Sequence, residues 1–131
     1  ELISKILDRA KFSPDTVFFL SPMKKPEKLR KYLYENGYEI SEEFLSEEED
    51  KIYTAIKAVK TGKRNSFSEF DTYFSRALIE SKNPYLSDYV SRKIFKTEKK
   101  LKGRKNTVGR YGDTENLENL LSEMYKFKET L

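Results

Sequence analysis

The hydrophobic pattern of this chain changes near residue 62, and this change constrains the fold more than any other feature. Strand-like apolar stretches lie between helix-like segments before this point, whereas only helical periodicity follows it. The charge changes at the same place: residues 1–62 carry 11 basic and 12 acidic side chains, and residues 63–131 carry 15 and 10. The sequence therefore predicts two domains, an α/β part over residues 1–62 and a helical part over residues 63–131.

The first part reads as helix, strand, helix. Apolar residues at helical spacing predict an amphipathic helix over residues 2–11, and the unbroken apolar run Thr16–Leu20 predicts a strand buried on both faces. A second helix is expected from Pro26, a favoured first helical residue, to Gly37, a favoured helix stop. This order is typical of a doubly wound sheet.

A β-hairpin is expected next. The two strands are predicted at about Tyr38–Leu45 and Ile52–Val59, joined by the polar connector Ser46–Asp50. Such an antiparallel hairpin commonly closes a sheet whose other strands are parallel.

The second part is expected to be helical throughout. Ser66 and Glu69 fit a capping box ahead of one apolar stripe, and Asn83-Pro84 fits the start of a helix of about 19 residues. Residues 103–113 contain three glycines and predict a loop, and a last helix is expected over residues 117–131. Two long amphipathic helices joined by a loop predict an antiparallel, coiled-coil-like hairpin.

The composition excludes several kinds of active site. Cysteine and histidine are both absent, so the chain holds no disulfide, thiolate nucleophile, zinc finger or Ser-His-Asp triad. The acidic stretch Glu47–Asp50 lacks the ligand spacing of a calcium loop, and the glycines of residues 103–112 do not follow a strand as a dinucleotide site requires. We identify no catalytic, cofactor-binding or metal-binding residue in this chain.

Location is constrained less strongly. No apolar run approaches the roughly 20 residues of a membrane span, and no signal peptide is recognisable. A chain without cysteine is compatible with a reducing compartment, and we expect a cytoplasmic protein with no membrane contact. Because the first residue is Glu1 rather than Met, we expect a piece of a longer protein.

The strongest local signal is a basic run. Its nine cations are opposed by a single carboxylate, which gives a net charge of +8 within 19 residues and predicts attraction to a polyanion. Tyr89, Phe95 and Tyr111 could stack on unpaired bases. The alternative is a solvated helix face that serves only solubility. The cations are Arg92, Lys93, Lys96, Lys99, Lys100, Lys102, Arg104, Lys105 and Arg110.

A second basic cluster lies on the helix expected after the first strand. We interpret it as an ordinary outward-facing helix surface, although ligands of open α/β sheets bind near the carboxyl ends of strands. Its residues are Lys24, Lys25, Lys28, Arg30 and Lys31.

Several segments resemble one bacterial enzyme family. Phe18–Met23, Leu29–Ile40 and Asp50–Tyr53 are similar to the strand, turn, helix and hairpin of the tRNA (adenine(22)-N(1))-methyltransferases. Ser21 and Thr54 stand where that family has a turn glutamine and a strand glutamate. The resemblance continues through Phe70–Phe74 and Asn83-Pro84 into the long basic helix, and it weakens after about Gly103.

The resemblance implies a function for a longer protein. In that family a Rossmann-like domain binds S-adenosylmethionine through a Gly-rich loop, and a C-terminal helical domain helps to hold the tRNA. The chain would then be the C-terminal portion, with its cofactor and catalytic residues upstream, and alone it would be inactive and would not bind the cofactor. Pro22 would lie beside the substrate pocket, and the nine cations of the basic run would contact tRNA.

Two other functions stay open at this stage. The chain could be a non-enzymatic RNA-binding module, or its helical hairpin could be a dimerisation surface. A truncated sheet should also expose apolar parts of its first helix and strand, so the chain is expected to associate or to be less stable. The sequence does not define the oligomeric state.

Overall fold

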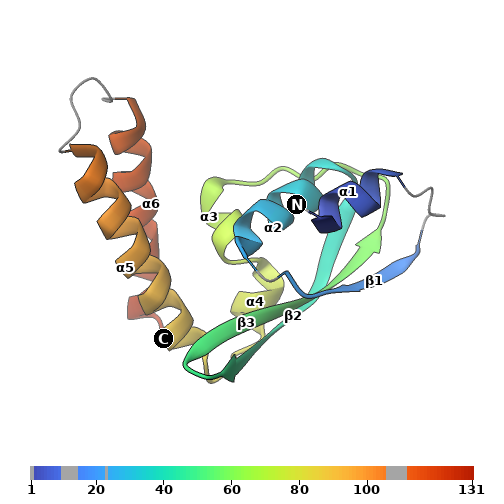
Figure 1. Ribbon diagram of the computed structural model, residues 1–131, viewed down its shortest axis with the longest axis horizontal. Helices are drawn as coiled ribbons and strands as arrows, with labels where there is room; N and C mark the ends of the chain where they lie inside the picture. The colour runs from blue at the N-terminus through green and yellow to red at the C-terminus, as the bar shows by residue number, and fades with distance from the viewer. Residues whose placement is uncertain (1, 10–14, 23, 106–111) are drawn as a thin grey trace. The chain divides into compact units, whose positions relative to one another are not determined.

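The computed structural model describes residues 2–9, 15–22, 24–105 and 112–131. The chain divides into two compact units, Glu1–Tyr85 and Leu86–Leu131 (Figure 1). The first unit holds a three-stranded sheet with helices, and the second holds two long helices. The predicted boundary near residue 62 marks the end of the strands, whereas the division itself falls between Tyr85 and Leu86.

The predicted hairpin is confirmed, with longer strands and a tighter turn. Strand β2 covers Tyr38–Glu48 and β3 covers Lys51–Lys60, so the connector shrinks to Glu49 and Asp50. Both residues have positive φ angles, 50° and 64°, as a two-residue turn of the primed type requires. This turn geometry matches the twist of the strands and allows pairing to continue up to Lys51.

Strand β1, Val17–Leu20, pairs antiparallel with β3, and the sheet order is β1-β3-β2. All strand pairs of the described residues are antiparallel, so the expected parallel neighbours are not seen in this part of the chain. The prediction that this strand is buried on both faces is wrong, because burial alternates along it. Phe18 packs against the core, whereas Phe19 is 79% exposed.

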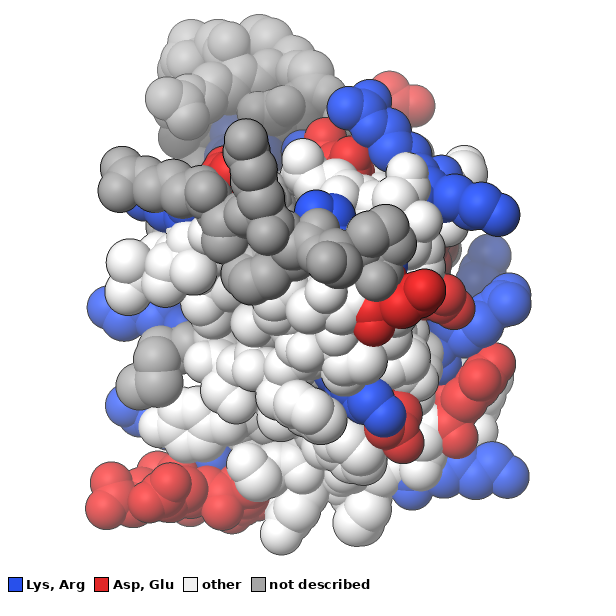
Figure 2. All heavy atoms as spheres, turned by 90° about the vertical axis from the view of Figure 1, so that its right-hand side faces the viewer, with Lys and Arg blue, Asp and Glu red and all other residues white. Residues whose placement is uncertain are grey.

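The outer side of β1 and part of the first helix are apolar and exposed, as expected. Val17, Leu2 and Ile6 are 45%, 72% and 53% exposed. Figure 2 shows the side of the molecule that carries β1, where uncharged residues fill much of the middle of the view. The association that we expect from this exposure stays a prediction.

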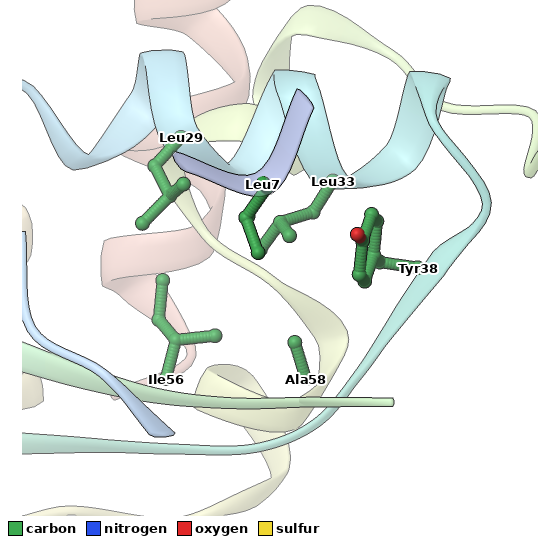
Figure 3. Close-up of a cluster of buried hydrophobic side chains, with 6 residues drawn as sticks. All are labelled: Leu7, Leu29, Leu33, Tyr38, Ile56 and Ala58. Carbon is green, nitrogen blue, oxygen red and sulfur yellow. The ribbon is translucent and has the colours of Figure 1, made fainter. Parts of the chain in front are cut away.

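Helices α1, Leu2–Arg9, and α2, Pro26–Glu35, cover the inner face of the sheet. Leu7 of α1 and Leu29 and Leu33 of α2 point toward β3 and exclude water from its centre (Figure 3). Helix α2 begins at Pro26 and ends before Gly37, whose φ of 81° suits glycine. Residues 10 and 11 of the expected first helix lie outside the described residues. The core cluster comprises Leu7, Leu29, Leu33, Tyr38, Ile56 and Ala58.

The next apolar stripe forms two short helices instead of one. Helix α3 covers Glu69–Tyr73 and α4 covers Arg76–Glu80. The capping box predicted for Ser66 and Glu69 lies two residues further on: the Ser68 amide donates to Asp71 at 2.8 Å, and the Ser68 hydroxyl accepts from the Asp71 amide. Because α3 contacts α2 and α4 contacts β2, both helices belong to the sheet unit.

The second unit is an antiparallel pair of helices, as predicted. Helix α5 covers Leu86–Lys105 and α6 covers Gly112–Glu129. Residues 103–105 and 112–113 of the expected loop are helical, and the rest of it lies outside the described residues. Residues buried in this unit include Val90, Ile94, Leu117, Leu120 and Met124. In the described part of the chain, no helix combines the length and apolarity needed to cross a membrane.

Candidate nucleic-acid interface

Four lysines form the basic face of α5: Lys96, Lys99, Lys100 and Lys102. All four are exposed and make no ion pair, hydrogen bond or ring contact within the described residues. Lys99 and Lys100 lie three and four residues after Lys96, so both are its neighbours on the surface of the helix. Their charges therefore face solvent together, and the local potential is positive.

The other predicted cations of α5 have partners within the protein. Arg92 pairs with Asp88 at 3.1 Å, and the Lys93 Nζ lies 5.2 Å from the centroid of the Tyr89 ring. Lys105 pairs with Glu118 of α6 at 3.1 Å. Arg104 is half-buried and also interacts with the protein. Arg110 lies outside the described residues, so the structure brings together four fully available cations.

Glu98, the single carboxylate of the basic run, also has a partner within the protein. Glu98 accepts a hydrogen bond from the Tyr125 hydroxyl of α6, and this hydrogen bond raises the pKa of Tyr125 above its usual value. Next to it, the Thr97 hydroxyl donates to the carbonyl oxygen of Lys93 at 2.8 Å and lies 3.9 Å from the sulfur of Met124. These contacts anchor one side of α5 on α6, and the lysines lie on the remaining surface.

The three aromatic residues proposed for base stacking differ in position. Tyr89 is only 4% exposed, so the prediction that it stacks on bases is wrong. Phe95 is 68% exposed. Tyr111 lies outside the described residues. Burial follows from the helix pairing, because Tyr89 shares the buried face of α5 with Val90 and Ile94.

One residue of the basic cluster predicted on α2 is buried rather than exposed. Lys24, Lys25, Lys28 and Lys31 are exposed, as expected of an outward surface, but Arg30 points inward and is fully buried. Pro22, two residues after the end of β1, is also buried.

Arg30 belongs to a buried polar network that sequence analysis missed. Its Nη2 lies 2.5 Å and its Nε 3.1 Å from the two carboxylate oxygens of Glu43, and its Nη1 donates to the carbonyl oxygens of Thr72 and Tyr73, each at 2.9 Å. The ion pair thus ties α2 to β2 and to α3.

The carboxylate side of this network is equally complete. Glu43 also accepts hydrogen bonds from the Thr54 hydroxyl at 2.7 Å and from the Ser75 hydroxyl at 2.8 Å. Among the described residues, no buried side-chain nitrogen or oxygen lacks a partner. A closed network of this kind supports the fold and offers no free group for catalysis.

The described residues also show no candidate metal site. They contain no group of three or more His, Cys, Asp or Glu side chains that could together hold a metal ion. The space that a Cβ at Gly37 would fill is occupied by the backbone of Gly62, 3.0 Å away. Gly37 thus allows a close backbone contact between the start of β2 and the residues that follow β3.

Solved structures share this fold. The Bacillus subtilis M1A22 tRNA methyltransferase TrmK is 21% identical with a TM-score of 0.71, and 98% of this chain covers 57% of that one. A Streptococcus agalactiae protein of the NADB-Rossmann superfamily is 17% identical with a TM-score of 0.73, covering 97% and 55%. The TrmK of M. capricolum, solved in complex with S-adenosyl-homocysteine, is 16% identical with a TM-score of 0.62, and 97% of this chain covers 54% of that one.

These likenesses show that the chain shares the α/β fold of these proteins. The chain spans little more than half the length of these structures. No curated protein matches it. Residues 1–127, however, match the family described as TrmK, tRNA (adenine(22)-N(1))-methyltransferase. The chain therefore belongs to the TrmK family.

Proposed function

We propose that this chain is the C-terminal part of an S-adenosylmethionine-dependent enzyme that methylates N1 of adenosine 22 in tRNA. The observation that carries the proposal is the family match over residues 1–127. The fold shared with the B. subtilis M1A22 tRNA methyltransferase supports it. In this proposal the sheet with α1–α4 belongs to the Rossmann-like catalytic domain, and α5 with α6 is a helical arm.

The cofactor would be held by residues outside the described part of the chain. The M. capricolum neighbour was solved with S-adenosyl-homocysteine, which supports S-adenosylmethionine as the methyl donor. The chain spans 54% of that neighbour, and we place the cofactor-binding and catalytic residues in the part it lacks, so we expect the 131-residue chain alone neither to bind this cofactor nor to methylate RNA. Isothermal titration calorimetry tests this: micromolar S-adenosylmethionine binding would contradict it. Pro22 stays proposed as a residue beside the substrate pocket.

The basic face of α5 would contribute to tRNA binding. Its four lysines are exposed and have no partner in the part of the chain that the structure describes, so their counterions can be exchanged for phosphates. Arg92, Lys93, Arg104, Lys105 and Arg110 stay proposed as further contacts. The alternative is that the chain binds RNA without any link to catalysis, or that it serves as a dimerisation module.

Filter binding of a tRNA transcript at several salt concentrations tests this role. Replacing Lys96, Lys99, Lys100 and Lys102 with Gln should weaken binding and reduce the slope of log K against log salt by about three, since each phosphate contact contributes about 0.7–0.9. The matched control replaces four exposed lysines of the sheet unit, Lys24, Lys31, Lys51 and Lys63, with Gln.

The two quadruple variants have the same net charge. If the interface is localised on α5, only the variant that lacks the lysines of the basic face should bind tRNA more weakly. Equal weakening by both would contradict a localised interface. No retention of tRNA even at low salt, together with a mass that rises with protein concentration, would instead identify a dimerisation module.

A further inference from the structure

We infer that Phe95 and the lysines beside it form a site for an unpaired nucleotide, in which the ring stacks on a base and the ammonium groups hold the neighbouring phosphates. This inference rests on the proposed RNA binding and makes it more specific. It selects single-stranded or looped RNA over a continuous duplex as the ligand of this part of α5.

The position of Phe95 is the first argument. Its side chain is 68% exposed, more than any other large apolar side chain among the described residues of its unit. The buried residues of α5 include Tyr89, Val90 and Ile94, so Phe95 takes no part in the packing of α5. Within the described residues its ring makes no contact with another ring or with a cation. Both properties leave a face of the ring accessible.

The surrounding charge is the second argument. Lys99 is four residues after Phe95 and Arg92 is three before it, so both lie next to the ring on the helix surface, and Lys102 follows two turns on. The carboxylate of Glu98, three residues after Phe95, also lies in this neighbourhood and accepts a hydrogen bond from Tyr125 of α6, but the cations around the ring outnumber it. An aromatic ring set among cations is the arrangement by which proteins bind unpaired nucleotides, since bases stack on the ring while phosphates meet the charges.

Another exposed phenylalanine shows why the setting matters. Phe44 on β2 is 51% exposed, but it has exposed carboxylates on both sides along the strand. Glu42 lies two residues before it, and Glu47 and Glu48 lie three and four residues after it. Carboxylates repel phosphates, so a ring there would not attract RNA. Phe44 is therefore a matched control for the removal of an exposed aromatic ring.

Fluorescence anisotropy with labelled RNA tests the site. The two probes are an unstructured ten-nucleotide RNA and a blunt duplex of the same sequence, and the proteins are wild type, Phe95→Ala, Phe95→Tyr and Phe44→Ala. Stacking of one base is worth about 1–3 kcal/mol, so Phe95→Ala should bind the single strand about tenfold more weakly. Binding of the duplex and the salt dependence should change little, because no charge is removed.

The two remaining variants complete the design. Phe95→Tyr keeps a stacking ring and should bind the single strand as wild type does, and Phe44→Ala should leave both probes unaffected. Circular dichroism melting should show unchanged folding for every variant, since both positions are exposed.

Three results would overturn the inference. They are equal weakening of single strand and duplex by Phe95→Ala, no weakening of either, or loss of self-association in place of RNA binding. If wild type binds tRNA with a steep salt dependence in these cases, the proposed function stands and only the stacking site fails. If wild type binds no RNA at all, the proposed RNA binding fails first.

Discussion

Arg30 of α2 and Glu43 of β2 form a fully buried ion pair in which Nη2 and Oε2 are 2.5 Å apart. The two carboxylate oxygens of Glu43 also accept hydrogen bonds from the Nε of Arg30 and from the hydroxyls of Thr54 and Ser75. A buried pair gains its attraction only where the geometry and the additional hydrogen bonds offset the loss of hydration. The pair therefore fixes how α2, β2 and the start of α4 fit together.

Removing one partner of this pair should destabilise the fold strongly. Arg30→Met leaves a buried carboxylate and Glu43→Leu leaves a buried guanidinium, so each should lower the free energy of unfolding by about 3–5 kcal/mol. The double variant buries no charge and should lose clearly less than the sum of the two. Urea denaturation followed by circular dichroism measures all three, and additive losses would contradict this reading.

The half-exposed pair of Lys57 and Glu42, 3.3 Å apart, provides the control. Lys57→Met should lower the free energy of unfolding by less than about 1 kcal/mol, because solvent screens an exposed pair.

Alanine substitutions at Gly37 and Gly62 distinguish the cost of a steric contact from the cost of a left-handed backbone. Gly37 and Gly62 have φ angles of 81° and 77°, so alanine at either position pays about 1–2 kcal/mol for a left-handed backbone. Only at Gly37 would the new Cβ also meet another atom, the Gly62 Cα at 3.0 Å, whereas a Cβ at Gly62 meets nothing within 4 Å. Gly37→Ala should therefore lower the melting temperature more than Gly62→Ala, and the reverse order would refute the packing described for this pair.

The hairpin turn can be improved. Glu49 and Asp50 both adopt positive φ angles, which Asn and Gly tolerate better in a two-residue turn. The double substitution Glu49→Asn and Asp50→Gly should raise the free energy of unfolding by about 1 kcal/mol. In the adjoining strand, Glu48→Gly should lower it by about 0.5–1 kcal/mol, because glycine loses more backbone entropy on folding. Stability that falls in the turn variant would argue against the two-residue turn.

Tyr34 should make the fold sensitive to alkali. Burial raises the pKa of Tyr34 from 10.0 to about 12, with Glu43 and Asp71 adding to the rise and Arg30 opposing it. Below pH 10 the hydroxyl is protonated in both states, so its contribution is complete. Between pH 10 and 12 the unfolded chain loses the proton first, and stability falls with rising pH by at most about 3 kcal/mol.

The test compares wild type with Tyr34→Phe. The variant lacks the hydrogen bond from the Tyr34 hydroxyl to the Asp71 carbonyl oxygen, 3.1 Å long, and should be less stable at neutral pH by about 1 kcal/mol. That difference should shrink and then reverse above pH 10. A Tyr34→Phe curve that runs parallel to that of wild type across the same pH range would exclude the effect.

Local patterns predicted the helices and the hairpin well, but not the inner residues of β2. A bulge between Ile40 and Glu42 adds Ser41 to the strand, so Tyr38 and Ile40 face the core before it, and Glu43 and Leu45 after it. Simple alternation from Tyr38 would have placed Phe44 inside and Glu43 outside. The buried ion pair was thus invisible to periodicity, because one inserted residue inverts the two faces.

The basic face of α5 could be predicted in outline, because it depends only on the spacing of residues along one helix. The spacing of Lys96, Lys99 and Lys100 alone places them together on a helix. Which neighbouring cations are occupied depends on α6, since Lys105 meets Glu118 only after the two helices pair. The burial of Tyr89 is likewise set by the choice of packing face.

The Ser75 hydroxyl has two partners at once. It accepts a hydrogen bond from the Leu78 amide at 3.1 Å and thereby caps the N-terminus of α4. It also donates a hydrogen bond to the Glu43 carboxylate at 2.8 Å. If this five-residue helix frayed, the buried carboxylate of Glu43 would lose the hydrogen bond from Ser75. Fraying therefore costs more free energy than the backbone hydrogen bonds of so short a helix would account for. The helix and the sheet should consequently open as one cooperative unit, with the amide of Leu78 exchanging its hydrogen as slowly as those at the centre of β3.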